Sequence, residues 1–219
     1  MMHSEKNFWK TLSRPVMLLA PMEDVTDTAF RELVMRISNP EHLDVLFTEF
    51  TSTDGFCHEV GRENVIKRFK ISDSERHWLD KTNTKIVAQI WGTDPEKFYR
   101  SAKHITGEMD FDGIDINMGC PVKKIVKNGG CSALINTPEL AKEIILATKE
   151  GTNLPVSVKT RTGNSKNTTP RRGLAICSKP NPLPLPCTAA PKKPCRKFPP
   201  IGRKWVKPLP SETRKILKP

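Results

Sequence analysis

The sequence has no long apolar run. No stretch of its 219 residues approaches the roughly eighteen consecutive apolar residues that a membrane-spanning helix needs. The first ten residues, MMHSEKNFWK, are polar and lack the apolar core of a secretory signal. We therefore expect a cytoplasmic protein without a membrane partner, long enough for one large domain or two small ones.

The sequence also has no pair of cysteines at the spacing that is typical of metal ligands. The six cysteines form no Cys-x-x-Cys motif and no Cys/His pattern typical of a metal site; they are Cys57, Cys120, Cys131, Cys177, Cys187 and Cys195. The sequence therefore predicts neither a bound metal nor a disulfide framework. A reduced protein is the expectation.

Acidic residues are scarce in the last quarter of the chain. Residues 165–219 hold 14 of the 36 Lys and Arg residues but only one of the 24 Asp and Glu residues, Glu212. They also hold 12 of the 19 prolines, which block helices and remove backbone donors. Such a composition does not bury enough apolar surface to fold. We expect a disordered or aberrant basic, Pro-rich tail at 165–219, behind a folded part at 1–164 whose charges nearly balance.

The first 160 residues alternate short apolar runs with helical patterns. Five strands are predicted, at residues 16–20, 45–50, 85–91, 113–116 and 155–159. Helices are predicted to begin after capping residues, at Thr26 or Asp27, at Asp94 and at Thr137. Strands that alternate with helices indicate parallel βαβ units.

Two of the helices carry an apolar face that we expect to point inward. Its residues are Phe30, Leu33, Val34 and Ile37 in the first helix and Leu140, Ala141, Ile144 and Ile145 in the last, which Gly151 ends as C-cap. The segment 51–84 has a mixed pattern. We interpret its basic residues first as a solvated face and only second as an RNA contact; they are Arg62, Lys67, Arg68 and Lys70.

Polar residues follow the C-terminal ends of several predicted strands. Barrels of parallel strands build their sites at that end. No Gly-x-Gly-x-x-Gly motif follows the first strand, which disfavours the dinucleotide-binding open sheet. The pattern therefore predicts an α/β fold, an incomplete (β/α)8 TIM barrel of about five βα units.

The turn after the fourth predicted strand reads Asn-Met-Gly-Cys-Pro, residues 117–121. Gly119 and Pro121 end regular pairing, and the turn presents the amide of Asn117 and the thiol of Cys120. An amide and a thiol at this spacing suit a site that orients a planar substrate with one group and protonates it with the other. A buried structural cysteine beside a turn asparagine is the alternative.

Four segments together resemble the tRNA-dihydrouridine synthase family. They are LAPMEDVTDTAFR (19–31), VAQI (87–90), DINMGCP (115–121) with Lys123 and Lys124 following, and VKTRTG (158–163). The likeness covers roughly residues 15–163, in family order and at barrel spacing. It implies an FMN-dependent enzyme that uses NADPH to reduce the C5–C6 bond of selected uridines in tRNA to 5,6-dihydrouridine.

The resemblance also implies roles for individual residues. Those expected to bind the flavin are Pro21, Met22, Glu23, Gln89 and Lys159. Gln89 offers both a donor and an acceptor to the pyrimidine-like edge of the ring, and a cation such as Lys159 stabilises the reduced ring.

The implied substrate contacts lie on the same end of the barrel. Asn117 and Arg161 are expected to hold the target base, which must leave its stack to be reduced. Cys120 is expected to protonate C5 opposite the hydride. That role needs a thiol, and an ordinary cysteine with a pKa near ~8.5 is mostly protonated at neutral pH.

Other readings of these residues stay open. Gln89 would equally satisfy backbone groups at a strand end, Lys159 would sit in solvent or an ion pair, and Arg161 would cap a loop. The lysines at 123, 124 and 127 form a solvated helix face or hold phosphates. Cys57 and Cys131 are interpreted as structural, with Cys131 filling space where the family usually has a small residue.

The chain departs from the family after residue 163. The remaining strands, a site histidine, the Gly-rich flavin-phosphate site and the helical RNA-binding domain do not follow. We therefore expect this polypeptide to fold poorly and to be weak or inactive. The alternative functions are a non-catalytic RNA-interacting remnant with a basic tail, and a flavin barrel acting on free pyrimidines.

Overall fold

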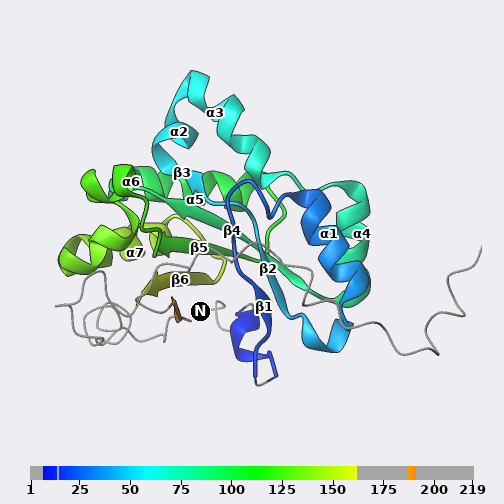
Figure 1. Ribbon diagram of the computed structural model, residues 1–219. Coiled ribbons are helices and arrows are strands. Elements are labelled where there is room, and N and C mark those ends of the chain that lie inside the picture. Colours follow the sequence, from blue (N-terminus) through cyan, green and yellow to red (C-terminus); the bar gives the residue numbers. More distant parts are fainter. Residues whose placement is uncertain (1–6, 14, 162–186, 191–219) are drawn as a thin grey trace, which may run out of the picture.

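Parallel strands form a single curled sheet in the computed structural model (Figure 1). The structure describes residues 7–13, 15–161 and 187–190. Its seven strands are β1 (Leu18–Leu19), β2 (Val45–Phe47), β3 (Thr51–Ser52), β4 (Lys85–Trp91), β5 (Gly113–Met118), β6 (Val156–Arg161) and β7 (Cys187–Ala190). Their order is β1-β2-β4-β5-β6-β7, with β3 also paired to β4, and every pairing is parallel. The sheet is the incomplete barrel that the sequence predicts.

All five predicted strands are present; β4 has its predicted bounds, and the other four differ from theirs. The predicted strand at 45–50 is interrupted at Thr48, whose hydroxyl accepts a hydrogen bond from the backbone N of Gln89 at 3.1 Å. The backbone N of Thr48 still donates to the carbonyl O of Val87 at 3.0 Å. The chain therefore leaves the sheet after β2 and rejoins the same neighbour as β3.

Helices cover the outer face of the sheet. They are α1 (Thr28–Ile37), α2 (Thr53–Cys57), α3 (Glu59–Val65), α4 (Asp73–Thr82), α5 (Pro95–Glu108), α6 (Lys123–Lys127) and α7 (Pro138–Glu150), with 3₁₀ turns η1 (Phe8–Lys10), η2 (Pro40–His42), η3 (Ile66–Phe69) and η4 (Cys131–Asn136). In Figure 1, α1 and α4 lie together on one side of the sheet, α6 and α7 on the other, and α2 and α3 project above β3.

Capping residues mark several helix starts as predicted. Asp27 accepts from the backbone N of Phe30 at 2.8 Å, and Asp94 accepts from the backbone N of Glu96 at 3.0 Å. Thr137 precedes α7 but makes no side-chain capping bond. The mixed segment 51–84 folds into β3, α2, α3, η3 and α4. Of its basic residues, Lys67 and Lys70 are exposed and Arg62 and Arg68 are half-buried.

The predicted inward face is confirmed for α7 but wrong for α1. In α7, Ala141, Ile144 and Ile145 are buried. In α1, Leu33 and Ile37 are 53% and 75% exposed. The buried residues of α1 are Arg31 and Met35, because an ion pair takes the inward position.

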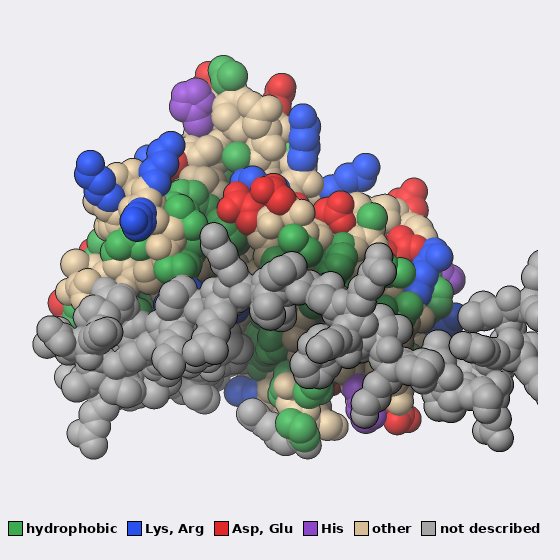
Figure 2. Space-filling view, in the orientation of Figure 1, with side chains coloured by type: hydrophobic (Ala, Val, Ile, Leu, Met, Phe, Trp, Pro, Cys, Tyr) green, Lys and Arg blue, Asp and Glu red, His purple; other side chains and the backbone are tan. Residues whose placement is uncertain are grey.

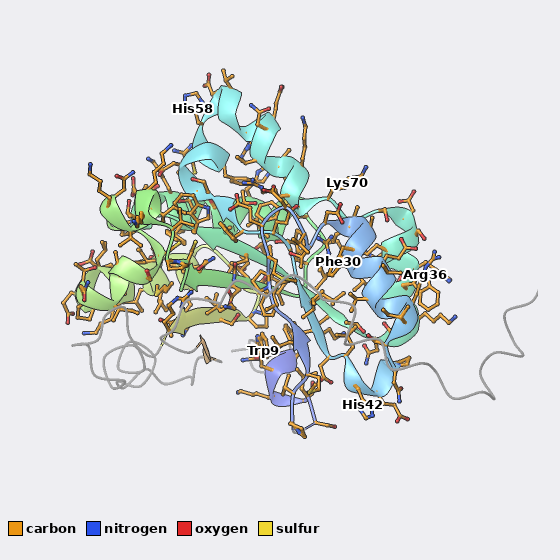
Figure 3. The ribbon with its side chains drawn as sticks, in the orientation of Figure 1. Trp9, Phe30, Arg36, His42, His58 and Lys70 are labelled. Atoms are coloured by element: carbon orange, nitrogen blue, oxygen red, sulfur yellow. The ribbon has the colours of Figure 1, made fainter. Side chains whose placement is uncertain are left out.

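That ion pair joins α1 to α4. The Arg31 guanidinium contacts both carboxylate oxygens of Glu75, at 2.6 and 2.8 Å, and both side chains are fully buried. It also donates to the carbonyls of Thr26 and Lys70, at 2.6 and 2.8 Å. A buried charge pair is stable only when its hydrogen bonds are complete, and these are. The pair therefore ties the loop after β1 to the turn before α4, where Figure 3 labels Lys70.

The two faces of the sheet differ in chemistry. Outward side chains such as Ile86, Ile90, Ile114 and Ile116 are buried under the helices in the main apolar core. The inward side chains near the start of the strands form a second cluster around Val45, Phe47, Val87 and Phe8 of η1. Phe8 and its neighbour Trp9, labelled in Figure 3, thus fill the inner face from the N-terminal end of the strands.

The expected disordered tail at 165–219 falls almost wholly outside the described residues. Its exception is β7, which pairs with β6 from Val158↔Cys187 to Arg161↔Ala190. This strand was not predicted. Within the described part of the chain, no helix is both long and apolar enough to span a membrane.

We predict opposite effects for two glycine substitutions. A Cβ at Gly151 would lie 2.4 Å from the carbonyl O of Tyr99, whereas a Cβ at Gly107 in α5 meets nothing within 4 Å. Gly151→Ala should destabilise the protein by ~1–3 kcal/mol, because α5 and α7 must move apart. Gly107→Ala should stabilise it by up to ~1 kcal/mol through helix propensity. Urea unfolding followed by circular dichroism measures both; equal effects would contradict the packing described.

Candidate active site

A row of polar side chains crosses the inner face of three neighbouring strands. Gln89 of β4, Asp115 of β5 and Ser157 of β6 stand in register. The Gln89 Nε2 donates to one Asp115 carboxylate oxygen at 2.6 Å, and the Ser157 hydroxyl donates to the other at 2.6 Å. All three residues are buried. The carboxylate is thus held from both sides by donors.

Asn117 extends this row to the C-terminal end of β5. Its Nδ2 donates to Gln89 Oε1 at 3.1 Å. Its Oδ1 accepts from the backbone N of both Gly119 and Cys120, each at 3.0 Å. The amide therefore holds the turn that carries the thiol, a role more structural than the substrate contact predicted for it.

Asp115 is the buried charge in this network. Burial raises the pKa of its carboxyl to about 6, against the opposing effects of the hydrogen bonds from Ser157 and Gln89 and of the nearby charge of Lys159. Asp115 is therefore largely ionised at neutral pH and becomes protonated in mild acid.

Cys120 and Cys131 form a thiol pair at the turn. Hydrogen bonding with the neighbouring Cys131 is the largest cause that lowers the pKa of Cys120 to about 6, although burial opposes it. The same bond and burial raise the pKa of Cys131. Cys131 has a left-handed backbone with φ of 51°, and the backbone N of Ser132 donates to the Cys120 carbonyl at 3.3 Å. The expectation of an ordinary, protonated Cys120 is therefore wrong, and Cys131 does more than fill space.

Two cationic side chains of β6 lie beside the turn. Arg161 donates from Nε to the Gly119 carbonyl, and its charge helps to lower the pKa of Cys120. Lys159 is half-buried in register with Asn117. Its ammonium makes no hydrogen bond or ion pair with other residues in the described part of the chain, and its charge acts on Asp115.

The loop after β1 comes close to the thiol pair. Glu23 raises the pKa of Cys120 through its negative charge, and it forms a 2.9 Å ion pair with Arg68. Met22 is held by the Thr26 hydroxyl, whose oxygen lies 3.0 Å from both its backbone N and its carbonyl O. The buried Glu49 accepts from the backbone N of Asp24 at 2.6 Å. Pro21, Met22 and Glu23 thus sit on a loop fixed from two sides.

The structure brings most predicted site residues to one end of the sheet. Gln89, Asn117, Cys120, Lys159 and Arg161 are linked by hydrogen bonds, strand register or electrostatic contact. The α6 lysines Lys123, Lys124 and Lys127 are exposed nearby, where Figure 2 shows blue side chains over the left flank. Among the described residues, no cluster of His, Cys, Asp and Glu is arranged to hold a metal ion.

Comparison with known proteins assigns the chain to a family. The model of the dihydrouridine synthase (Dus) family matches residues 18–174. The chain belongs to the dihydrouridine synthase family. It is 50% identical over 159 residues to a probable tRNA-dihydrouridine synthase of Staphylococcus epidermidis, covering 73% of this chain and 45% of that protein. It is 46% identical over 158 residues to probable tRNA-dihydrouridine synthase 2 of Bacillus subtilis, covering 72% and 45%. The chain thus spans less than half the length of these curated relatives.

Sequence reasoning missed three residues of this candidate site. Asp115 and Ser157 were not singled out, although each is a polar residue at an alternate position of an otherwise apolar strand. That period of two places both on the inner face beside Gln89. Glu49 gave no such signal, because its role depends on the path of the loop that carries Asp24.

We predict that Cys131 controls the acidity of Cys120. Cys131→Ala removes the hydrogen bond that contributes most to the lowered pKa, so the pKa of Cys120 should rise from about 6 toward the ~8.5 usual for a thiol. Cys131→Ser keeps a donor and should retain much of the lowering. The measurement is the rate of Cys120 alkylation by iodoacetamide from pH 5 to 9, read by peptide mass spectrometry. An unchanged profile in Cys131→Ala would refute the pairing.

Proposed function

We propose that this chain forms the N-terminal part of the barrel of an FMN-dependent, NADPH-using enzyme that reduces uridines in tRNA to 5,6-dihydrouridine. The observation that carries the proposal is the meeting of Gln89, Asn117, Cys120 and Lys159 at the C-terminal end of adjacent parallel strands. Barrel enzymes act at this end. The curated relatives bear the same activity in their names, and the cytoplasm is the expected location.

The residues present fit the ring of FMN. Gln89 uses one N–H and one lone pair of its amide within the protein, which leaves one of each for the pyrimidine-like edge of a flavin. The Lys159 ammonium, without a hydrogen bond or ion pair to the described residues, suits the negative charge of a reduced ring. The loop of Pro21, Met22 and Glu23 would line the same site. Bound FMN would supply the hydride for uracil C6.

Cys120 and Cys131 would supply the proton for C5. Reduction of the C5–C6 bond adds one hydride and one proton, so the protein must hold a proton beside the base. The thiol pair holds one between its two sulfur atoms, with the higher pKa on Cys131. Transfer of that proton to Cys120 would make Cys120 the donor, and the pair would regain a proton from solvent.

Base and backbone contacts would come from groups around the turn. Asn117 has one amide N–H left after its three hydrogen bonds, which can reach a uracil carbonyl. Arg161 lies beside the same turn. The exposed lysines of α6 suit tRNA phosphates, whose contribution to affinity falls with salt.

The alternative remains a non-catalytic RNA-interacting protein that uses the basic residues 165–219, whose composition is its only support. The two differ in which part of the chain contacts RNA. Removal of residues 165–219 would abolish tRNA binding under the alternative only.

We predict that Cys120→Ala lowers dihydrouridine formation by ~10²-fold or more, because the proton donor is lost. Unmodified tRNA, FMN and NADPH are incubated with the protein, and dihydrouridine is measured by mass spectrometry of nucleosides. FMN and tRNA affinities should stay within ~2-fold of the parent. Cys57→Ala is the matched control, since the Cys57 thiol hydrogen-bonds to Lys97 and Ser101 of α5, away from the turn. Activity that survives in Cys120→Ala would exclude the proposed role.

A further inference from the structure

The hydrogen bonds around Gln89 all run in one direction. The backbone N–H groups of Gly119 and Cys120 can only donate, so the side-chain atom of Asn117 that faces them must be its oxygen. The other end of that amide is then a donor, and the atom of Gln89 that faces it must also be an oxygen. The nitrogen of Gln89 is left to face Asp115, which must accept.

An ionised carboxylate is the one side chain at this position that accepts without donating. It fixes Gln89, which fixes Asn117, which holds the turn of Cys120. The charged or titratable group of β6 that faces Asp115 is Lys159, and Ser157 donates to its second oxygen. Neither Ser157 nor Lys159 can replace Asp115 as the partner of Gln89, because both belong to β6, which lies on the opposite side of β5 from Gln89.

We propose that Asp115 is a positioning residue, which sets the orientation of the Gln89 and Asn117 amides and through them the placement of the Cys120 thiol. The inference deepens the proposed function, on which it rests for its purpose: the same orientation leaves one N–H of Gln89 and one of Asn117 for a ligand. Asp115 itself touches neither the base nor the thiol. It lies two residues before Asn117 on the same face of β5 and acts by determining which way each amide is oriented.

The test follows Cys120 directly and needs no FMN, NADPH or tRNA. Asp115→Leu removes the acceptor and keeps the branching at Cγ, while Asp115→Asn keeps a carbonyl oxygen for Gln89 and can donate its NH₂ to Ser157. Gln89→Leu breaks the row one step later and serves if Asp115→Leu does not fold. Ser157→Ala is the matched control, since it removes the other hydrogen bond of Asp115. Each full-length variant is alkylated with iodoacetamide from pH 5 to 9, and the Cys120 peptide is quantified.

The expected result is a graded pattern. In Asp115→Leu and in Gln89→Leu the midpoint of the alkylation profile should rise by at least about one pH unit, because the loosened turn weakens the Cys131 hydrogen bond. Asp115→Asn and Ser157→Ala should keep the parent midpoint. The Asp115→Leu/Gln89→Leu double variant should move no further than Gln89→Leu alone, because Asp115 acts through Gln89.

Several results would overturn the proposal. They are a parent profile in Gln89→Leu, an additive shift in the double variant, a shift in Ser157→Ala as large as in Asp115→Leu, or a failure of Asp115→Asn to keep the parent profile. Failure of the proposed function has a different signature. The alkylation profiles would follow this pattern, but the protein would either form no dihydrouridine or form it without Cys120. The two are therefore distinguishable.

Discussion

The carboxylate of Asp115, buried in the middle of the sheet, is the constraint on which the site depends. An isolated charge in such a position is costly unless donors surround it, and here Gln89 and Ser157 do so from the two neighbouring strands. Parallel register supplies those donors at the same level. The charge in turn orders the amides above it, so strand pairing at the centre of the sheet sets the geometry of the turn at its end.

A buried ion pair has the same function for the other wall of the site. Arg31 and Glu75 hold the start of α1 against the start of α4, with the Thr28 hydroxyl donating to Glu75 at 2.5 Å. The loop that carries Glu23 leads into α1, the helix that contains Arg31. Both walls are therefore positioned by buried charges whose hydrogen bonds are complete. Such a preorganised site can bind its ligand without rearrangement.

The strands were predicted well because a strand that is buried on both faces has a simple sequence signal, a short run of apolar residues. The strand at 85–91 was predicted with its observed bounds, and Asp27 and Asp94 marked helix starts by local capping chemistry. The inward face of α1 was wrong because an arginine with a remote partner replaces the apolar stripe. The link between Cys120 and Cys131 was missed for the same reason: ten residues lie between two groups whose contact depends on how η4 returns to the strand end.

The low pKa of Cys120 is compatible with a role as an acid when the effect of a bound base is considered. Burial already opposes the lowering, because a thiolate loses solvation when it is covered. A planar base stacked over the turn would remove more solvent from the sulfur and raise its pKa further, while Cys131 keeps a proton within reach. The open site would thus hold a thiolate and the covered site a thiol. Cys120 would therefore carry a proton that it can donate only when a substrate covers the turn.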